Sequence, residues 1–150
     1  MTKPANLAAL GSTRPNFLLL PPVSVLLGVV VAASANLPLD GGAALIALIG
    51  AALAHISVNA LNEYEDFRSG LDLRTSRTPF SGGTGTLVVH PHLAWQVHLI
   101  GLISLALTAL CGLILSVRVG WGLLPIGALG MGLIYFYTSR INHYHWLCLI

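Results

Sequence analysis

The chain has 150 residues, of which 55% are apolar and only 8% are charged, and its formal net charge is +2. Soluble domains carry about 25% charged residues, so this composition excludes a water-soluble globule. The small net charge argues against nucleic acid as a partner, and two distant cysteines indicate neither a disulfide framework nor a metal site. The composition therefore predicts an integral membrane protein surrounded by a lipid bilayer.

Four apolar stretches are long enough to cross a bilayer as helices, which takes roughly 20 residues. They cover residues 17–35, 43–61, 93–115 and 121–137. Turn residues around Pro38 separate the first stretch from the second, and turn residues around Gly120 separate the third from the fourth. The second stretch carries small residues that let helix backbones approach closely, namely Gly50, Ala51, Ala54 and Ser57. The predicted fold class is all-α, a polytopic bundle of about four transmembrane helices.

The basic residues are divided unevenly between the two sides that four spans would define. One side holds Lys3, Arg14, Arg68, Arg74, Arg77 and Arg140, and the other holds Arg118. The positive-inside rule then places the connection over residues 62–92 in the cytoplasm. A cleaved signal peptide ending near Ala33-Ser34-Ala35 is the alternative for the first stretch. Its apolar run is longer than a usual signal peptide and contains Pro21-Pro22, which favours a span.

Acidic residues gather in one polar region at the end of the second apolar stretch. The five acids are Asp40, Glu63, Glu65, Asp66 and Asp72, so four of them fall within ten residues. Three arginines follow in or just after the same region, and the rest of the chain is almost uncharged. The polar region is therefore where a functional site is expected.

Four polar residues at the end of the second stretch are spaced to lie on one face of a helix. His55, Asn59, Asn62 and Asp66 are separated by 4, 3 and 4 positions, which places their side chains above one another. Polar groups in a membrane helix are costly unless they face protein or a water-filled cavity. His55 and Asn59 are therefore expected to point inward, either toward such a cavity or into hydrogen bonds between helices.

The polar region has the donor set of a metal–diphosphate site. Asn62, Asp66 and Asp72 supply oxygen ligands, and Mg²⁺ usually takes one or two carboxylates together with waters and substrate phosphates. The arginines supply forked donors that match diphosphate oxygens. A plain solvated loop is the other interpretation. The glycine-rich segment over residues 82–85 favours a flexible turn over a phosphate loop, because no lysine follows it and no strand precedes it.

From Asn62 to Asp72 the chain reads Asn-Glu-Tyr-Glu-Asp-Phe-Arg-Ser-Gly-Leu-Asp. This segment resembles the UbiA superfamily of membrane prenyltransferases, in particular the 1,4-dihydroxy-2-naphthoate prenyltransferase branch of menaquinone synthesis. That branch reads approximately Asn-Asp-Tyr-x-Asp-x-x-x-Gly-x-Asp after its second helix, and Glu63 stands where it has Asp. The segment over residues 77–83 and Arg14-Pro15 also resemble family sequence.

The resemblance implies binding of an isoprenyl diphosphate through Mg²⁺, ionisation of the allylic C–O bond, and attack of the carbocation on an aromatic acceptor. It implies that Asn62, Asp66 and Asp72 hold Mg²⁺ and the diphosphate, with the two aspartates as the catalytic pair. The candidate substrate-binding residues are Asn59, Asn62, Arg68 and Arg77.

The chain also departs from the family pattern. Members have nine helices, are about twice as long, and carry a second Asp-rich motif after the sixth helix. No acid follows Asp72 in this chain. The chain is therefore expected to be a partial enzyme, to need a missing C-terminal half, and to have little activity alone. The alternative function, from another class, is a small non-catalytic four-helix membrane protein that uses its acidic loop for binding.

Overall fold

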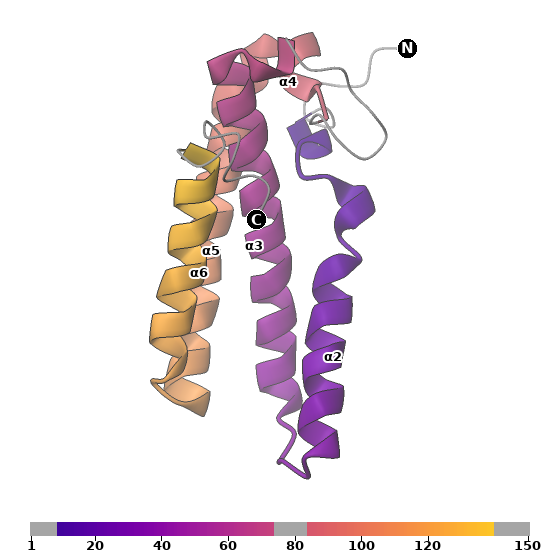
Figure 1. Ribbon diagram of the computed structural model, residues 1–150, viewed down its shortest axis with the longest axis vertical. Coiled ribbons are helices and arrows are strands. Elements are labelled where there is room, and N and C mark those ends of the chain that lie inside the picture. The colour runs from indigo at the N-terminus through magenta and orange to yellow at the C-terminus, as the bar shows by residue number, and fades with distance from the viewer. Residues whose placement is uncertain (1–8, 74–83, 140–150) are drawn as a thin grey trace.

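The computed structural model describes residues 9–73 and 84–139, and the elements within these ranges are helices (Figure 1). Four of them are long: α2 (Leu20–Ser34), α3 (Gly41–Ser69), α5 (Ala94–Val119) and α6 (Leu123–Ser139). The short ones are η1 (Pro15–Phe17), η2 (Leu71–Leu73), α4 (Thr86–Val89) and η3 (Pro91–Leu93). The predicted all-α membrane helix bundle is confirmed.

Two helices of the described part, Gly41–Ser69 and Pro91–Val119, are long and apolar enough to cross a membrane. A third span results if Leu20–Ser34 is joined to the preceding segment Ala9–Phe17, from which it is bent by 42°. The apolar part of α6, Leu123–Phe136, is shorter. The second and third predicted spans, residues 43–61 and 93–115, lie within these two long helices.

Helix α3 extends well beyond the predicted span over residues 43–61. It begins at an N-cap, Asp40, whose carboxylate accepts from the amides of Gly42 and Ala43 at 2.8 and 3.1 Å. It ends at Gly70, which has a positive φ of 72° and closes the helix as a C-cap. No helix breaker precedes Gly70 in the polar region, so residues 62–69 are helical and the predicted connection over 62–92 begins eight residues later than expected.

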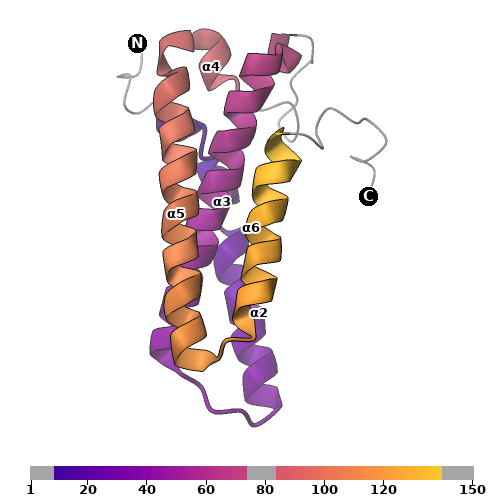
Figure 2. The ribbon, with the colours of Figure 1, turned by 90° about the vertical axis from the view of Figure 1, so that its left-hand side faces the viewer.

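Helix α3 lies between α2 on one side and α5 with α6 on the other (Figure 1), and Figure 2 shows α5 and α6 side by side. Its closest packing is against α5. Ser57 donates to the backbone carbonyl of Gly101 at 2.9 Å, and a Cβ at Gly50 would lie 3.1 Å from Cβ of Cys111. The small residues of α3 therefore allow the close approach that the sequence predicts.

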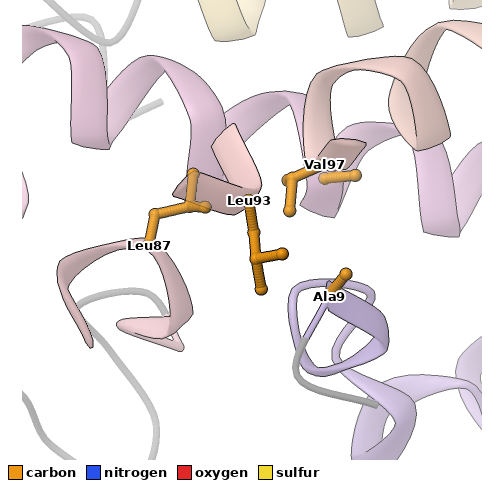
Figure 3. Packing of buried hydrophobic residues seen from close by; sticks show 5 residues of the cluster. Ala9, Leu87, Leu93 and Val97 are labelled. Atoms are coloured by element: carbon orange, nitrogen blue, oxygen red, sulfur yellow. The ribbon is translucent and has the colours of Figure 1, made fainter. Parts of the chain in front are cut away.

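The buried apolar core lies at one end of the bundle, which we call the α4 end (top of Figure 1). It consists of Ala9, Ala60, Leu87, Leu93 and Val97, with Tyr64, Phe67, Ala94 and Ile100 packed against it. Figure 3 shows Leu87, Leu93 and Val97 gathered near Ala9. Segments distant in sequence thus meet at this end, whereas large apolar side chains along the shafts of the long helices are exposed.

Candidate functional site

Two of the predicted ligands are paired on the last turns of α3, at the α4 end. The side-chain amide of Asn62 donates to Oδ2 of Asp66 at 2.9 Å. The two residues are one helical turn apart, so the spacing itself brings them together. Asp66 is only 7% exposed. The pair therefore places a carboxylate and an amide side by side in a site shielded from water.

The third predicted ligand, Asp72, returns to the same end of α3 because the chain reverses at Gly70. The amide of Gly70 bonds to the carbonyl of Phe67 at 3.1 Å, and the amide of Leu73 bonds to the carbonyl of Gly70 at 3.3 Å. Helix η2 consequently folds back and packs against α3. Asp72 is also 7% exposed, so both aspartates of the motif are buried at the end of one helix.

We expect Gly70→Ala to destabilise the chain by about 1 kcal/mol, because an L side chain is strained at a φ of 72°. Gly70→Asn should cost less, since Asn tolerates the left-handed conformation better than other non-glycine residues. Thermal unfolding of both variants in detergent measures the difference. Equal losses for Ala and Asn would show that the reversal at this position does not depend on backbone conformation.

The deeper members of the polar face, His55 and Asn59, make a hydrogen bond with each other instead of one between helices. The amide of Asn59 donates to the carbonyl of His55 at 2.8 Å, a bond within its own helix. Nε2 of His55 is buried and has no hydrogen-bond partner among the described residues. Arg14 lies near enough to His55 to interact with it electrostatically. The structure therefore shows no interhelical hydrogen bond from the described atoms of this pair.

The two arginines that the resemblance implies as phosphate contacts are not brought to the aspartates by the described residues. Arg68 is 69% exposed, and its guanidinium lies 3.8 Å from the carboxylate of Glu65. Arg68 follows Asp66 by two positions, about 200° around the helix, so the two side chains do not share a face. Arg77 lies outside the described residues.

Sequence reasoning missed the contact that Glu63 makes. One oxygen of its carboxylate accepts from the amide of Thr84 at 2.8 Å, and the other accepts from the Thr84 hydroxyl, also at 2.8 Å. Glu63 is 2% exposed, and its two partner atoms are 21 residues away in sequence. The one sign in the sequence that position 63 is unusual was that it holds Glu where the resembled family has Asp.

The side chains at the end of α3 offer oxygen donors of the kind that Mg²⁺ binds. Among the described residues no three His, Cys, Asp or Glu side chains group as a metal site. Mg²⁺ requires fewer protein ligands, since one or two carboxylates suffice and waters and phosphates complete its octahedron. Asp66 and Asp72 at the end of α3, with the side-chain oxygen of Asn62, fit that requirement.

A separate apolar groove lies between α5 and α6, in the half of the bundle away from the α4 end. Its volume is about 410 Å³, and its lining includes Thr108, Leu113, Leu124 and Met131. The groove contains almost no polar surface, so it suits a hydrocarbon chain rather than a charged group.

Comparison with known proteins confirms the resemblance carried by the motif. The chain is 33% identical over 127 residues to 1,4-dihydroxy-2-naphthoate octaprenyltransferase of Bacillus subtilis (strain 168). The matched region is 85% of this chain and 39% of that relative, so the chain spans about two fifths of the relative's length. No family model and no solved structure matches the chain.

Proposed function

We propose that this chain forms part of a UbiA-type membrane prenyltransferase, which transfers a polyprenyl group from an isoprenyl diphosphate to an aromatic acceptor of quinone biosynthesis. The observation that carries the proposal is the paired Asn62 and Asp66 on α3, with Asp72 returned to the same helix end at Gly70. The similarity to an octaprenyltransferase supports the same reaction class.

In this proposal Asn62, Asp66 and Asp72 hold Mg²⁺ bound to the diphosphate. Bound Mg²⁺ supplies positive charge that stabilises the diphosphate as it leaves. The residues of the chain fix that charge at the α4 end and keep bulk water away from it, since both aspartates are 7% exposed. A low-dielectric surrounding strengthens such charge stabilisation.

The proposed transfer breaks the allylic C–O bond, and both electrons leave on the diphosphate. A new C–C bond forms between the prenyl carbon and one carbon of the aromatic ring. That ring carbon then loses the substituent it carried, a proton in the simplest case, and the ring becomes aromatic again. Excluding water from the site prevents hydrolysis of the electron-poor prenyl carbon.

Three further residues are candidate contacts to the substrate, namely Arg68, Arg77 and Asn59, and each rests on a different observation. Arg68 could reach the diphosphate only by leaving Glu65, and an exposed ion pair of this kind is worth about 0–1 kcal/mol. Arg77 follows Asp72 by five positions, and its support is the resemblance to family sequence over residues 77–83. Asn59 lies one turn below Asn62 on the same face, where it would meet the substrate if it released the carbonyl of His55.

Part of the proposed active site would be supplied by a region of the relative that the alignment with this chain does not cover. The relative has a further region beyond the 39% that is aligned, and we propose that the corresponding C-terminal half supplies the second Asp-rich motif. The lipid bilayer and the apolar groove between α5 and α6 suit a long prenyl tail.

The test is prenyl transfer in membranes supplied with radiolabelled geranylgeranyl diphosphate, dihydroxynaphthoate and Mg²⁺. One sample contains the chain alone, and a second also contains the co-expressed region of the Bacillus subtilis relative that the alignment leaves uncovered. We expect product in the second sample and little in the first. The intact relative is the positive control.

The proposal fails if the complemented sample yields no product while the intact relative is active and the chain is folded. That result, together with an Asp66→Asn variant that behaves as the parent chain in every assay, would favour the non-catalytic binding protein. Product from the chain alone would support prenyl transfer and contradict the need for a second motif.

A further inference from the structure

Arg14 lies in the segment that precedes α2, and that segment is packed at the α4 end of the bundle. Ala9 belongs to the buried core (Figure 3), and Ser12 and Thr13 are 0% and 7% exposed. The hydroxyls of Ser12 and Thr13 donate to the carbonyls of Ala9 and Leu10 at 2.6 and 2.7 Å. The contacts of the segment therefore fix where Arg14 lies.

The backbone of Arg14 is strained. Its φ is 50° and its ψ is 65°, a left-handed conformation that an L side chain disfavours. Pro15 follows it, and a residue before proline prefers an extended backbone. The other described non-glycine residue with positive φ is Asn36, a residue type that tolerates this conformation. Strain of this kind is concentrated at binding and catalytic sites, which is consistent with a binding role for the Arg14 side chain.

The guanidinium of Arg14 has no anionic partner within residues 9–73 and 84–139. The ion pair in these ranges joins Arg68 to Glu65, and the Arg14 side chain makes no hydrogen bond there. Arg14 is half-buried, so water solvates its charge only in part. A guanidinium is a planar fork that binds a carboxylate through two parallel hydrogen bonds. Arg14 is therefore able to receive a carboxylate from a ligand.

His55 is a second group without a partner, and it lies near Arg14. Its Nε2 is buried and has no hydrogen-bond partner among the described residues, although buried polar atoms normally have one. Arg14 is close enough to interact with His55 electrostatically. Nε2 of a neutral imidazole is either a donor or an acceptor, and a hydroxyl group satisfies both cases. Together the two side chains match a ligand that carries a carboxylate and a hydroxyl.

His55 lies on the same face of α3 as the proposed Mg²⁺ ligands, deeper along the helix. It precedes Asn62 by seven positions, which is about 10 Å along the axis and a rotation within about 20° of two full turns. Asn59 lies between them on that face. Ser57, which bonds to Gly101 of α5, is about 200° around the helix from His55. The polar face is therefore directed away from α5.

We propose that Arg14 and His55 bind the polar end of the aromatic acceptor, with the Arg14 guanidinium on a carboxylate and Nε2 of His55 on a hydroxyl. The acceptor class is then a hydroxylated aromatic acid. Its reacting ring carbon has to touch the prenyl carbon, which is bonded to the diphosphate at Asn62 and Asp66. The ring then extends from Asn62 past Asn59 toward His55. This assignment rests on the proposed function and adds the acceptor subsite to it.

The subsite is tested first by equilibrium binding of 1,4-dihydroxy-2-naphthoate, without oxygen, to the chain co-expressed with the complementing region of the relative in lipid nanodiscs. Empty nanodiscs give the background. We expect Arg14→Gln to raise the Kd about tenfold or more, because the carboxylate loses its charged partner. The Kd of 1,4-dihydroxynaphthalene, the same ring system without the carboxylate, should change by less than about threefold. Arg118→Gln is the matched control, since Arg118 lies in the last turn of α5 at the other end of the bundle.

Two further variants separate binding from folding. Glycine adopts a φ of 50° without strain, so Arg14→Gly should melt no lower than the parent while its Kd for the acid rises as in Arg14→Gln. His55→Phe removes Nε2 and should weaken both ligands about threefold or more, because both carry hydroxyls. A parent that does not bind the acid overturns the proposal. An unchanged Kd for the acid in Arg14→Gln, or an equal loss for both ligands in that variant, also overturns it.

Steady-state kinetics of the complemented enzyme distinguish this proposal from the proposed function. Arg14→Gln should raise the KM for dihydroxynaphthoate about tenfold and leave the KM for geranylgeranyl diphosphate within about threefold. A rise only in the KM for the diphosphate would make Arg14 a diphosphate contact and overturn the subsite. An inactive parent contradicts the proposed function, and the binding experiment still decides the subsite. An active parent whose Kd and KM for the acid are unchanged in Arg14→Gln contradicts the subsite alone.

Discussion

Replacing Asp66 by Asn in the complemented enzyme is expected to reduce prenyl transfer by about a hundredfold or more, because the substitution removes one carboxylate from the proposed Mg²⁺–diphosphate site. The amide oxygen of Asn can still accept from Asn62, so the 2.9 Å contact has a replacement and the helix should remain folded. Steady-state transfer rates at several Mg²⁺ concentrations measure the effect. Asp72→Asn should act in the same way.

Asp40→Asn is the matched control for Asp66→Asn. Asp40 is an acid on the same helix, but it caps the opposite end through the amides of Gly42 and Ala43. Asn is an equally good N-cap, so this variant should be as stable and as active as the parent. Full transfer in both Asp66→Asn and Asp72→Asn would contradict the proposed function, whatever Asp40→Asn does.

The largest stability effect is expected at Gly101, where α3 and α5 are in closest contact. A Cβ at this position would lie 2.7 Å from Cγ and Cδ2 of Leu61 and 3.2 Å from its backbone nitrogen. We expect Gly101→Ala to lower the free energy of unfolding by about 1–3 kcal/mol, since such overpacking forces the helices apart. Separation would also stretch the bond from Ser57 to the Gly101 carbonyl. Denaturant unfolding in detergent measures the loss.

Gly112→Ala controls for the intrinsic effect of exchanging glycine for alanine in α5. A Cβ at Gly112 would meet no heavy atom within 4 Å, so the change should be neutral or stabilising. Combining Gly101→Ala with Leu61→Ala should recover part of the loss, because the shorter side chain makes room. If Gly101→Ala unfolds like Gly112→Ala, the close contact between the two helices does not contribute to stability.

The sequence predicted the helical class and the pairing within the motif because both depend on local spacing. Asn62 and Asp66 are one turn apart, and any helix through them brings their side chains together. The same periodicity indicated that the helix continues past residue 61, where hydropathy alone ended the span. The true end is set by Gly70 and its left-handed backbone.

The contact of Glu63 with Thr84 could not be predicted, since it depends on how the chain returns to α3 after 21 residues. Helix spacing alone predicts that Arg68, about 200° around the helix from Asp66, does not share a face with it. The resemblance nevertheless implied that Arg68 contacts the diphosphate. The contact of Gly101 with Leu61 depends on the register in which α3 and α5 pack, and the sequence of one helix does not specify that register by itself.

The length of α3 has a consequence for the depth at which a substrate would meet the protein. Its 29 residues make a helix about 43 Å long, whereas the hydrocarbon layer of a bilayer is about 30 Å thick. Asn62 lies 21 residues beyond Gly41, about 32 Å along the axis. If Gly41 lies at one boundary of the hydrocarbon, the segment from Asn62 to Ser69 emerges among the lipid headgroups on the other side. A prenyl diphosphate bound there keeps its phosphates level with those of the surrounding lipids, so it can diffuse in sideways from the leaflet without exposing its tail to water.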